Sequence, residues 1–242
     1  MNLTARYGEP VLKYRHPLFP ATVVKRYNSM IIDIKLSDDS VVPAFCARKE
    51  INSICTDGME VLVKRSTNKN RIIKYKIEYI NKDGRLIFTS PRYEERLFKE
   101  AFGSKVISEF ARYTDCRRIE PDDHLPHIHF ELTDTSGGKC FVFITTLYGY
   151  QGGKAIFPIG IDFFEIEMFE EMRKLRANGH ETYVFMIVPQ NNCFEAKFVW
   201  NAAPVAAAKL FEEAKNGLKF ISYGCNVDKT NVSIAEKIEI TY

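Results

Sequence analysis

The hydrophobic pattern of the 242-residue chain changes at Pro91, and this change limits the folds that the chain can adopt. Before Pro91, short apolar runs are separated by turn residues, and Asp83-Gly84 is a typical hairpin turn. Short runs at this spacing predict a small antiparallel barrel, for which an OB-type barrel is a natural candidate. The expected strands are residues 22–27, 30–36, 41–45, 59–64, 72–80 and 85–88.

Helical and strand-like segments alternate in the second part of the chain. Leu97, Phe98 and Ala101 begin an apolar face at helical spacing, which predicts a helix over residues 93–112. The continuous apolar run 183–188 indicates a central buried strand. Further strands are expected at 128–132, 140–146, 219–223 and, at a sheet edge, 237–241, with helices over 162–179 and 204–217.

This order of elements is typical of an α/β layout in which helices flank a sheet. It is also the order of the restriction-endonuclease-like core. Many α/β domains share this order, so that the residues themselves predict an OB-like β-barrel domain over residues 1–90 and an α/β domain over residues 91–242, with a nuclease-like core as one candidate.

Charge is distributed unevenly between the two parts. Residues 1–90 contain 16 Lys and Arg against 9 Asp and Glu, whereas residues 91–242 contain 18 against 22. A polyanion contact is therefore expected in the first part. The alternative explanation is a lysine-rich solvated face that has no ligand.

The cations of the first part gather around residues 64–76, where tyrosines interleave with them. This pattern suits single-stranded DNA or RNA, because cations follow the phosphates and aromatic faces stack on bases. The candidate contacts are Arg26, Tyr27, Lys64, Arg65, Lys69, Arg71, Lys74, Tyr75 and Lys76.

Two absences in the sequence bear on the compartment. The chain has no run of about 18 apolar residues of the kind that spans a membrane, and no apolar signal segment follows Met1. Its six cysteines form no C-x-x-C pair and are interpreted as buried free thiols. We therefore expect a cytoplasmic protein without membrane contact.

Several ordered segments resemble a known family. They include residues 17–27, the polar stretch 66–69 before Lys74-Tyr75, and the helical segments 94–101 and 107–110. Together they are similar to the sugar fermentation stimulation protein (SfsA) family over nearly the whole chain. The resemblance implies an OB-like domain joined to a nuclease-like domain of the PD-(D/E)xK type. It also implies nucleic-acid binding, with metal-dependent cleavage as a further activity.

The chain departs from this family at the positions that the nuclease chemistry uses. The family's Arg-x-Asp-Phe motif aligns with residues 127–130, so that His129 stands for the metal-binding Asp. The Glu-Val-Lys-Ser motif aligns with residues 143–146, so that Phe143 stands for the metal-binding Glu and Thr145 for the catalytic Lys. Ile159 replaces the Asp of the following Phe-Pro-Asp-Ala motif.

These replacements remove the groups that hold and assist Mg²⁺. The ion prefers carboxylate oxygens, polarises the phosphate and is helped by a cation that stabilises developing charge. Phe143 can neither ligate nor donate, Thr145 carries no charge, and Glu109 is a single remaining acid. We expect no Mg²⁺ cofactor of the nuclease type and no cleavage through this site.

The leading prediction is an SfsA-like nucleic-acid-binding protein without nuclease activity, and two alternatives stay open. His127 and His129 would point to the same side of a strand, so that they could hold a borderline metal with Glu109, Asp122 or Asp123 in a rebuilt nuclease. We favour the interpretation in which the two histidines bind no metal and are either hydrogen-bonded within the protein or exposed to solvent, at a site that has lost its nuclease residues. The net-acidic second part favours the other alternative, a protein-interaction or regulatory module.

Overall fold

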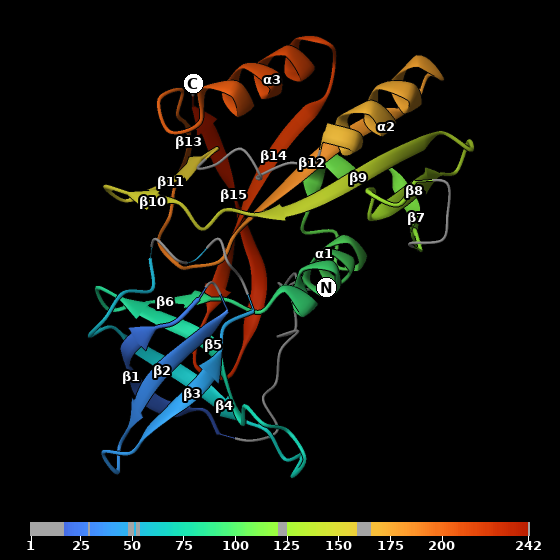
Figure 1. Cartoon of the computed structure of the whole chain (residues 1–242). Coiled ribbons are helices and arrows are strands. Elements are labelled where there is room, and N and C mark those ends of the chain that lie inside the picture. Colours follow the sequence, from blue (N-terminus) through green and yellow to red (C-terminus); the bar gives the residue numbers. More distant parts are fainter. Residues whose placement is uncertain are drawn as a thin grey trace, which may run out of the picture.

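The computed structural model describes residues 17–28, 30–47, 51, 54–120, 125–158 and 166–241, which form two sheets (Figure 1). The first sheet is a closed barrel, because its strand order β3-β2-β1-β4-β5 is completed by a parallel β3–β5 pairing. This confirms the OB-like barrel expected from the sequence. Its strands are β1 (Phe19–Arg26), β2 (Ile31–Leu36), β3 (Val41–Phe45), β4 (Glu60–Arg65) and β5 (Tyr75–Lys82), and β6 (Arg85–Phe88) adds to β5.

Alternation of side chains builds the barrel core. Ile32, Ile34, Val61 and Val63 are buried, while their neighbours along the strands face outward. The β4–β5 loop, residues 66–74, projects from the end of the barrel that lies farther from the second sheet (Figure 1). The barrel therefore presents this loop to solvent.

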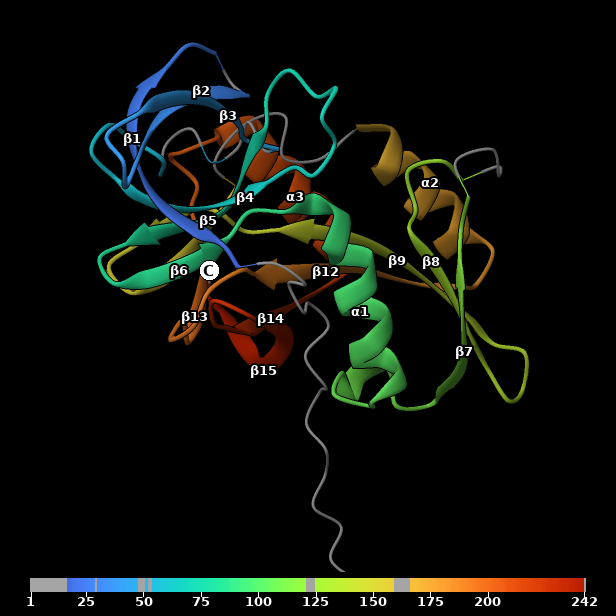
Figure 2. The same cartoon turned by 90° about the horizontal axis from the view of Figure 1, so that it is seen from below.

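The second sheet has nine strands in the order β10-β11-β13-β15-β14-β12-β9-β8-β7. β12 pairs in parallel with both β9 and β14, which confirms the central buried strand. The β7–β8 end of this sheet lies away from the barrel (Figure 2). The strands are β7 (Tyr113–Arg118), β8 (Phe130–Asp134), β9 (Lys139–Thr146), β10 (Tyr150–Gln151), β11 (Lys154–Phe157), β12 (Glu181–Val188), β13 (Glu195–Phe198), β14 (Lys219–Val227) and β15 (Val232–Thr241).

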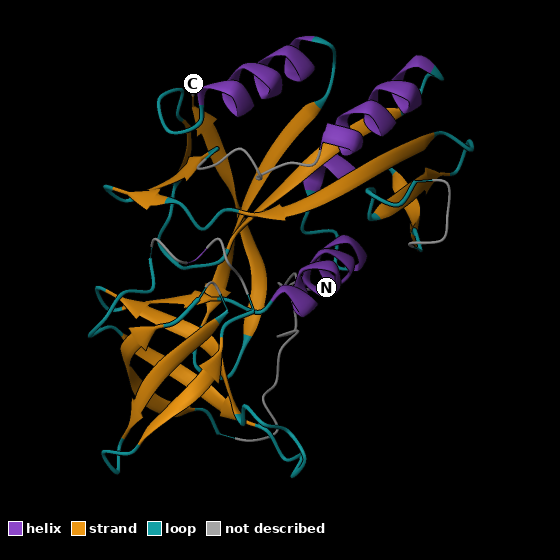
Figure 3. Cartoon of the chain, viewed as in Figure 1, coloured by secondary structure: helices purple, strands orange, loops and turns teal. Residues whose placement is uncertain are grey.

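Helices cover both faces of this sheet (Figure 3). α1 (Glu94–Gly103) packs on one face, and α2 (Ile166–Ala177) and α3 (Pro204–Lys215) pack on the other. α3 begins with its proline in the first turn and is followed by Gly217 at φ +90°, as helix signals in the sequence predict. Among the described residues, no helix is long and apolar enough to cross a bilayer.

The barrel and the second sheet share a hydrophobic core. Tyr79 of β5 and Phe88 of β6 lie in the same buried cluster as Phe185 of β12 and Tyr223 of β14. The backbone N–H of Phe88 also donates to the Pro189 carbonyl at 2.9 Å. Because buried residues cross the predicted boundary near residue 91, the two parts support each other.

Three expected elements differ from the structure. The helix predicted over 93–112 ends at Gly103, because the backbone at Lys105 turns to φ +58° before a short 3-10 helix, η3 (Ser108–Phe110), and β7. The last strand was expected at an edge, but β15 pairs with both β13 and β14. Residues 159–165, which include the expected start of the second helix, lie outside the described residues.

Candidate nucleic-acid interface and the degenerate nuclease site

The sheet brings the three replaced nuclease positions onto one face. His129 precedes β8 and lies opposite Phe143 of β9, with the two ring centroids 5.0 Å apart. Phe143 packs against the core beneath α2 and α3, and Thr145 follows two residues later on the same face. The motif alignment therefore identified true neighbours in space, whereas Ile159 lies outside the described residues.

The side chain of His129 is hydrogen-bonded to the backbone of the neighbouring strand β9. Its Nδ1 accepts a hydrogen bond from the backbone N–H of Ile144 at 3.0 Å. A ring nitrogen that accepts must carry a free lone pair, so the arrangement requires a neutral imidazole with its proton on Nε2. The Nδ1 lone pair is thus used within the protein.

His127 lies in a turn before β8 and not on the strand. Its Nδ1 is 2.7 Å from Glu171 Oε1, and its backbone N–H donates to Glu171 Oε2 at 3.3 Å. Glu171 belongs to α2, 44 residues further along the chain. Sequence reasoning missed this acid because no local spacing connects it to the histidine.

Glu109 lies on the opposite face of the sheet from His129. It accepts a hydrogen bond from the Tyr223 hydroxyl at 2.6 Å and pairs with Lys237 at 2.6 Å. Burial alone would raise the pKa of Glu109, but bonds from Lys237 and Tyr223 outweigh burial and hold the pKa below its ordinary value. The structure therefore does not bring Glu109, one of the acids considered in the alternative metal site, to His127 and His129, because η3 packs on the α1 side.

The β4–β5 end of the barrel carries a dense set of cations. Between Glu60 and Glu78 the sequence has no acidic residue. Lys64 is half-buried, and the other four cations of this set are exposed. In the described structure, none of the following side chains has an ion-pair or hydrogen-bond partner: Lys64, Arg65, Lys69, Arg71 and Lys74. We call these five residues the loop cations.

The other predicted contacts have different surroundings. Tyr27 is 62% exposed, and its hydroxyl donates to Asp33 at 2.9 Å. Arg26 donates to the Cys55 carbonyl at 3.2 Å, and Tyr75 packs partly against the barrel core.

Lys76, in contrast to the loop cations, is paired within the protein. Its ammonium donates to Glu78 at 3.1 Å and to the Ser90 hydroxyl at 2.6 Å, and only 19% of its side chain is exposed. The sequence pattern treats every lysine alike, but this one is covered where the barrel meets the segment leading to α1. Lys76 is therefore left out of the loop cations, and its contact with nucleic acid stays a prediction.

More than half of the chain is similar to a known protein family. Residues 92–231 match the family model described as "Sugar fermentation stimulation protein RE domain". The chain belongs to the SfsA family. The sugar fermentation stimulation protein homolog of Maricaulis maris is 29% identical over 231 residues, which cover 95% of this chain and 98% of the relative. The homolog of Rhodospirillum centenum is 25% identical over 232 residues, covering 95% and 100%.

A solved SfsA structure shares the fold. Pyrococcus furiosus SfsA, determined in complex with Ca²⁺, matches with a TM-score of 0.80 at 15% identity and covers 97% of this chain and 100% of its own. The OB-like barrel followed by a restriction-endonuclease-like α/β part is therefore the architecture of this SfsA-family chain.

The residues at the nuclease positions of this SfsA-family chain do not fit a magnesium site. Phe143 supplies no oxygen ligand, and the neutral ring of His129 is a softer ligand than Mg²⁺ prefers. Among the described residues, no group of three or more His, Cys, Asp or Glu side chains is placed to hold a metal ion. Residues 121–124, which include Asp122 and Asp123, lie outside this description.

Proposed function

We propose that this SfsA-family chain binds nucleic acid through the β4–β5 end of its barrel and does not cleave it through the nuclease-type site. The observation that carries the proposal is the set of five loop cations without partners. In OB folds the β1–β2 and β4–β5 loops flank the ligand-binding face. Here Tyr27, exposed where β1 ends, offers an aromatic surface for stacking on a base.

The chemistry of the replaced positions supports the second half of the proposal. Phosphodiester cleavage of this type needs a metal to polarise the phosphate and to generate the attacking hydroxide. The phenyl ring of Phe143 supplies no metal ligand, and the neutral hydroxyl of Thr145 supplies no positive charge. The site keeps the fold of a nuclease and has lost the groups that perform its chemistry.

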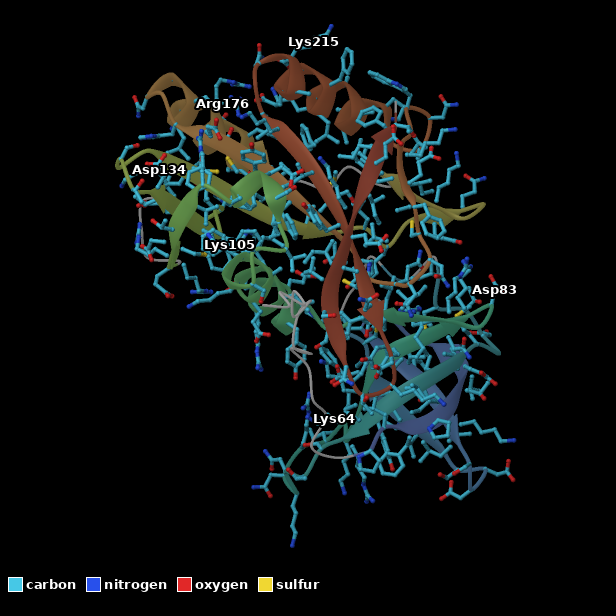
Figure 4. The ribbon with its side chains drawn as sticks, turned by 180° about the vertical axis from the view of Figure 1, so that it is seen from behind. Lys64, Asp83, Lys105, Asp134, Arg176 and Lys215 are labelled. Atoms are coloured by element: carbon cyan, nitrogen blue, oxygen red, sulfur yellow. The ribbon has the colours of Figure 1, made fainter. Side chains whose placement is uncertain are left out.

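Binding is tested by fluorescence anisotropy with labelled single-stranded and double-stranded DNA and RNA at low salt. The variant Lys69→Glu/Arg71→Glu/Lys74→Glu reverses three loop cations. The matched control is Lys174→Glu/Lys197→Glu/Lys215→Glu, which makes the same change in net charge. Figure 4 shows Lys215 at the opposite end of the molecule from Lys64.

We expect the loop variant to bind at least tenfold more weakly than the wild type at about 50 mM salt, and the control to lose much less. Equal losses in the two variants would show that net charge alone drives binding. Absence of wild-type binding at low salt would reject the proposal and favour a protein-interaction module.

Cleavage is tested by incubating the same nucleic acids with Mg²⁺, Mn²⁺ or Zn²⁺. We expect the strands to stay intact on a denaturing gel. Cleavage that disappears in His127→Ala/His129→Ala would instead establish a rebuilt histidine site.

A further inference from the structure

A polar cavity of about 450 Å³ lies where β12 and β14 end, between the loop that follows β12 and the β14–β15 hairpin. Open α/β sheets place ligands beyond the carboxyl ends of their parallel strands, and the volume is in the range of small-ligand sites. The wall of the cavity is rich in amide side chains, namely Gln190, Asn191, Asn192 and Asn226.

The amide side chains of this wall differ in their hydrogen bonding. The side chain of Asn191 accepts from the Val227 N–H and donates to the Val227 carbonyl, both at 2.7 Å, which braces the cavity. In the described structure, the side chains of Asn192 and Asn226 make no hydrogen bond. Amides of this kind offer a donor and an acceptor side by side, which matches the edge of a nucleobase.

An exposed aromatic ring stands in the same wall. Phe194 lines the cavity and is 75% exposed, although a phenyl ring gains nothing from contact with water. Flat aromatic faces beside amide groups are the usual means of holding an unstacked base. The ring and the unused amides thus point to the same class of ligand.

The charges around the cavity favour a neutral base over a phosphate as its occupant. Asp228 and Glu236 line it, and the cation Lys237 is neutralised by its ion pair with Glu109. A phosphate placed here would meet net negative charge, whereas a neutral base would not. The neutral base, and not a phosphate, is therefore the part of a strand that this wall fits.

The β14–β15 hairpin leads from this cavity to the barrel (Figure 1). Val227 lines the cavity, and Lys229, two residues further on, lines a groove of about 300 Å³ together with Leu62 of β4. Lys64 projects from the same side of β4 as Leu62. The tip of the hairpin and the outward side of β4 thus lie between the cavity and the loop cations.

We propose that this cavity binds one unpaired nucleobase of a nucleic-acid strand whose phosphates lie on the loop cations. The inference rests on the proposed nucleic-acid binding and adds to it a place where base identity is read. The barrel supplies affinity without sequence preference, and the cavity supplies discrimination between bases.

The test compares labelled single strands of equal length, each a homopolymer of one base, with an abasic strand. Phe194→Ala/Asn226→Ala removes the ring and one amide at exposed positions. Val205→Ala/Asn216→Ala, which alters an exposed apolar residue and an exposed amide at α3, is the matched control. We expect the wild type and the control to bind their preferred base roughly tenfold more tightly than the abasic strand. The cavity variant should lose most of this preference and keep its salt dependence.

Each outcome separates the two proposals. Binding that keeps its salt dependence but shows no base preference, or a preference that survives Phe194→Ala/Asn226→Ala, overturns the cavity assignment alone. A free nucleoside that competes as well as the whole strand overturns the requirement for phosphates on the barrel. Absence of wild-type binding to every strand rejects the underlying function.

Discussion

Glu213 of α3 is a fully buried carboxylate that ties two helices together. Arg176 of α2 pairs with it at 2.6 Å, and Arg173 of α2 donates to its other oxygen. Burial alone would raise the pKa of Glu213, but bonds from the two guanidinium groups outweigh burial and hold the pKa below its ordinary value. The ionised form is therefore the one that stabilises the fold.

We predict that Glu213→Ala lowers the free energy of unfolding by about 3 kcal/mol at pH 7, because it leaves Arg176 largely buried without its partner. A lowered pKa in the folded state means that this contribution is present above the unfolded value of about 4.3 and is lost as pH falls through the folded value. Urea unfolding should therefore show a gap between wild type and variant that narrows in acid. The exposed neighbour control, Glu212→Ala, should change stability little, and a gap that stays constant down to pH 3 would contradict the argument.

His129 and Phe143 are both half-buried and lie in contact across neighbouring strands. We expect His129→Asp/Phe143→Glu to unfold at a lower temperature than the wild type in a chelator, because two carboxylates would face each other across neighbouring strands. Millimolar Mg²⁺ should recover part of this loss by binding to the folded state. The unfolding temperatures of the variant and the wild type, each measured with and without Mg²⁺, test this expectation. An equal rise in the unfolding temperature of the wild type would count against a metal site at these positions.

At the scale of elements, local patterns predicted the barrel strands, the central strand and α3. The Asp83-Gly84 turn has positive φ at both residues, as its sequence indicates. β7, β10, β11 and β13 were missed, because short strands are defined by the partners that they pair with. The helix after Pro91 was overextended, since Phe110 continues the apolar spacing beyond the break at Lys105.

For the candidate site, the sequence predicted contacts between neighbouring strands but not the partners that come from distant elements. His129 and Phe143 were placed together by their motifs, because strand register turns a fixed sequence spacing into a contact. The partners of His127 and Glu109 come from distant elements, and only tertiary packing determines them. The loop cations were predicted as a group, but the ion pair of Lys76 depends on a glutamate that faces the junction of the two parts.

The β4–β5 loop gives a prediction at this same scale. Each phosphate contact to a single strand contributes roughly 0.7 to the slope of log affinity against log salt. Reversal of Lys69, Arg71 and Lys74 should therefore reduce the slope by about 2, whereas the control on α2, β13 and α3 should leave it unchanged. Anisotropy titrations over a salt series measure both slopes, and an unchanged slope in the loop variant would place the phosphates elsewhere.

For the whole molecule, the shared core makes the barrel and the second sheet depend on each other. Phe88 is 1% exposed and contacts residues of both parts. We predict that Phe88→Ala costs about 3–5 kcal/mol and lowers hydrogen-exchange protection in β2 and β12 together. Ile32→Val, within the barrel core, is a milder control. Two separate unfolding transitions in the wild type would contradict this coupling.

The β14–β15 hairpin belongs to the second sheet, yet its tip lies beside β4 of the barrel. The hairpin therefore lies between the amide-lined cavity and the barrel that carries the loop cations. A ligand that engages both places must be long enough to bridge them, and the second contact then forms at high effective concentration. Under the proposed function, strands too short to reach both places should therefore bind more weakly than longer strands.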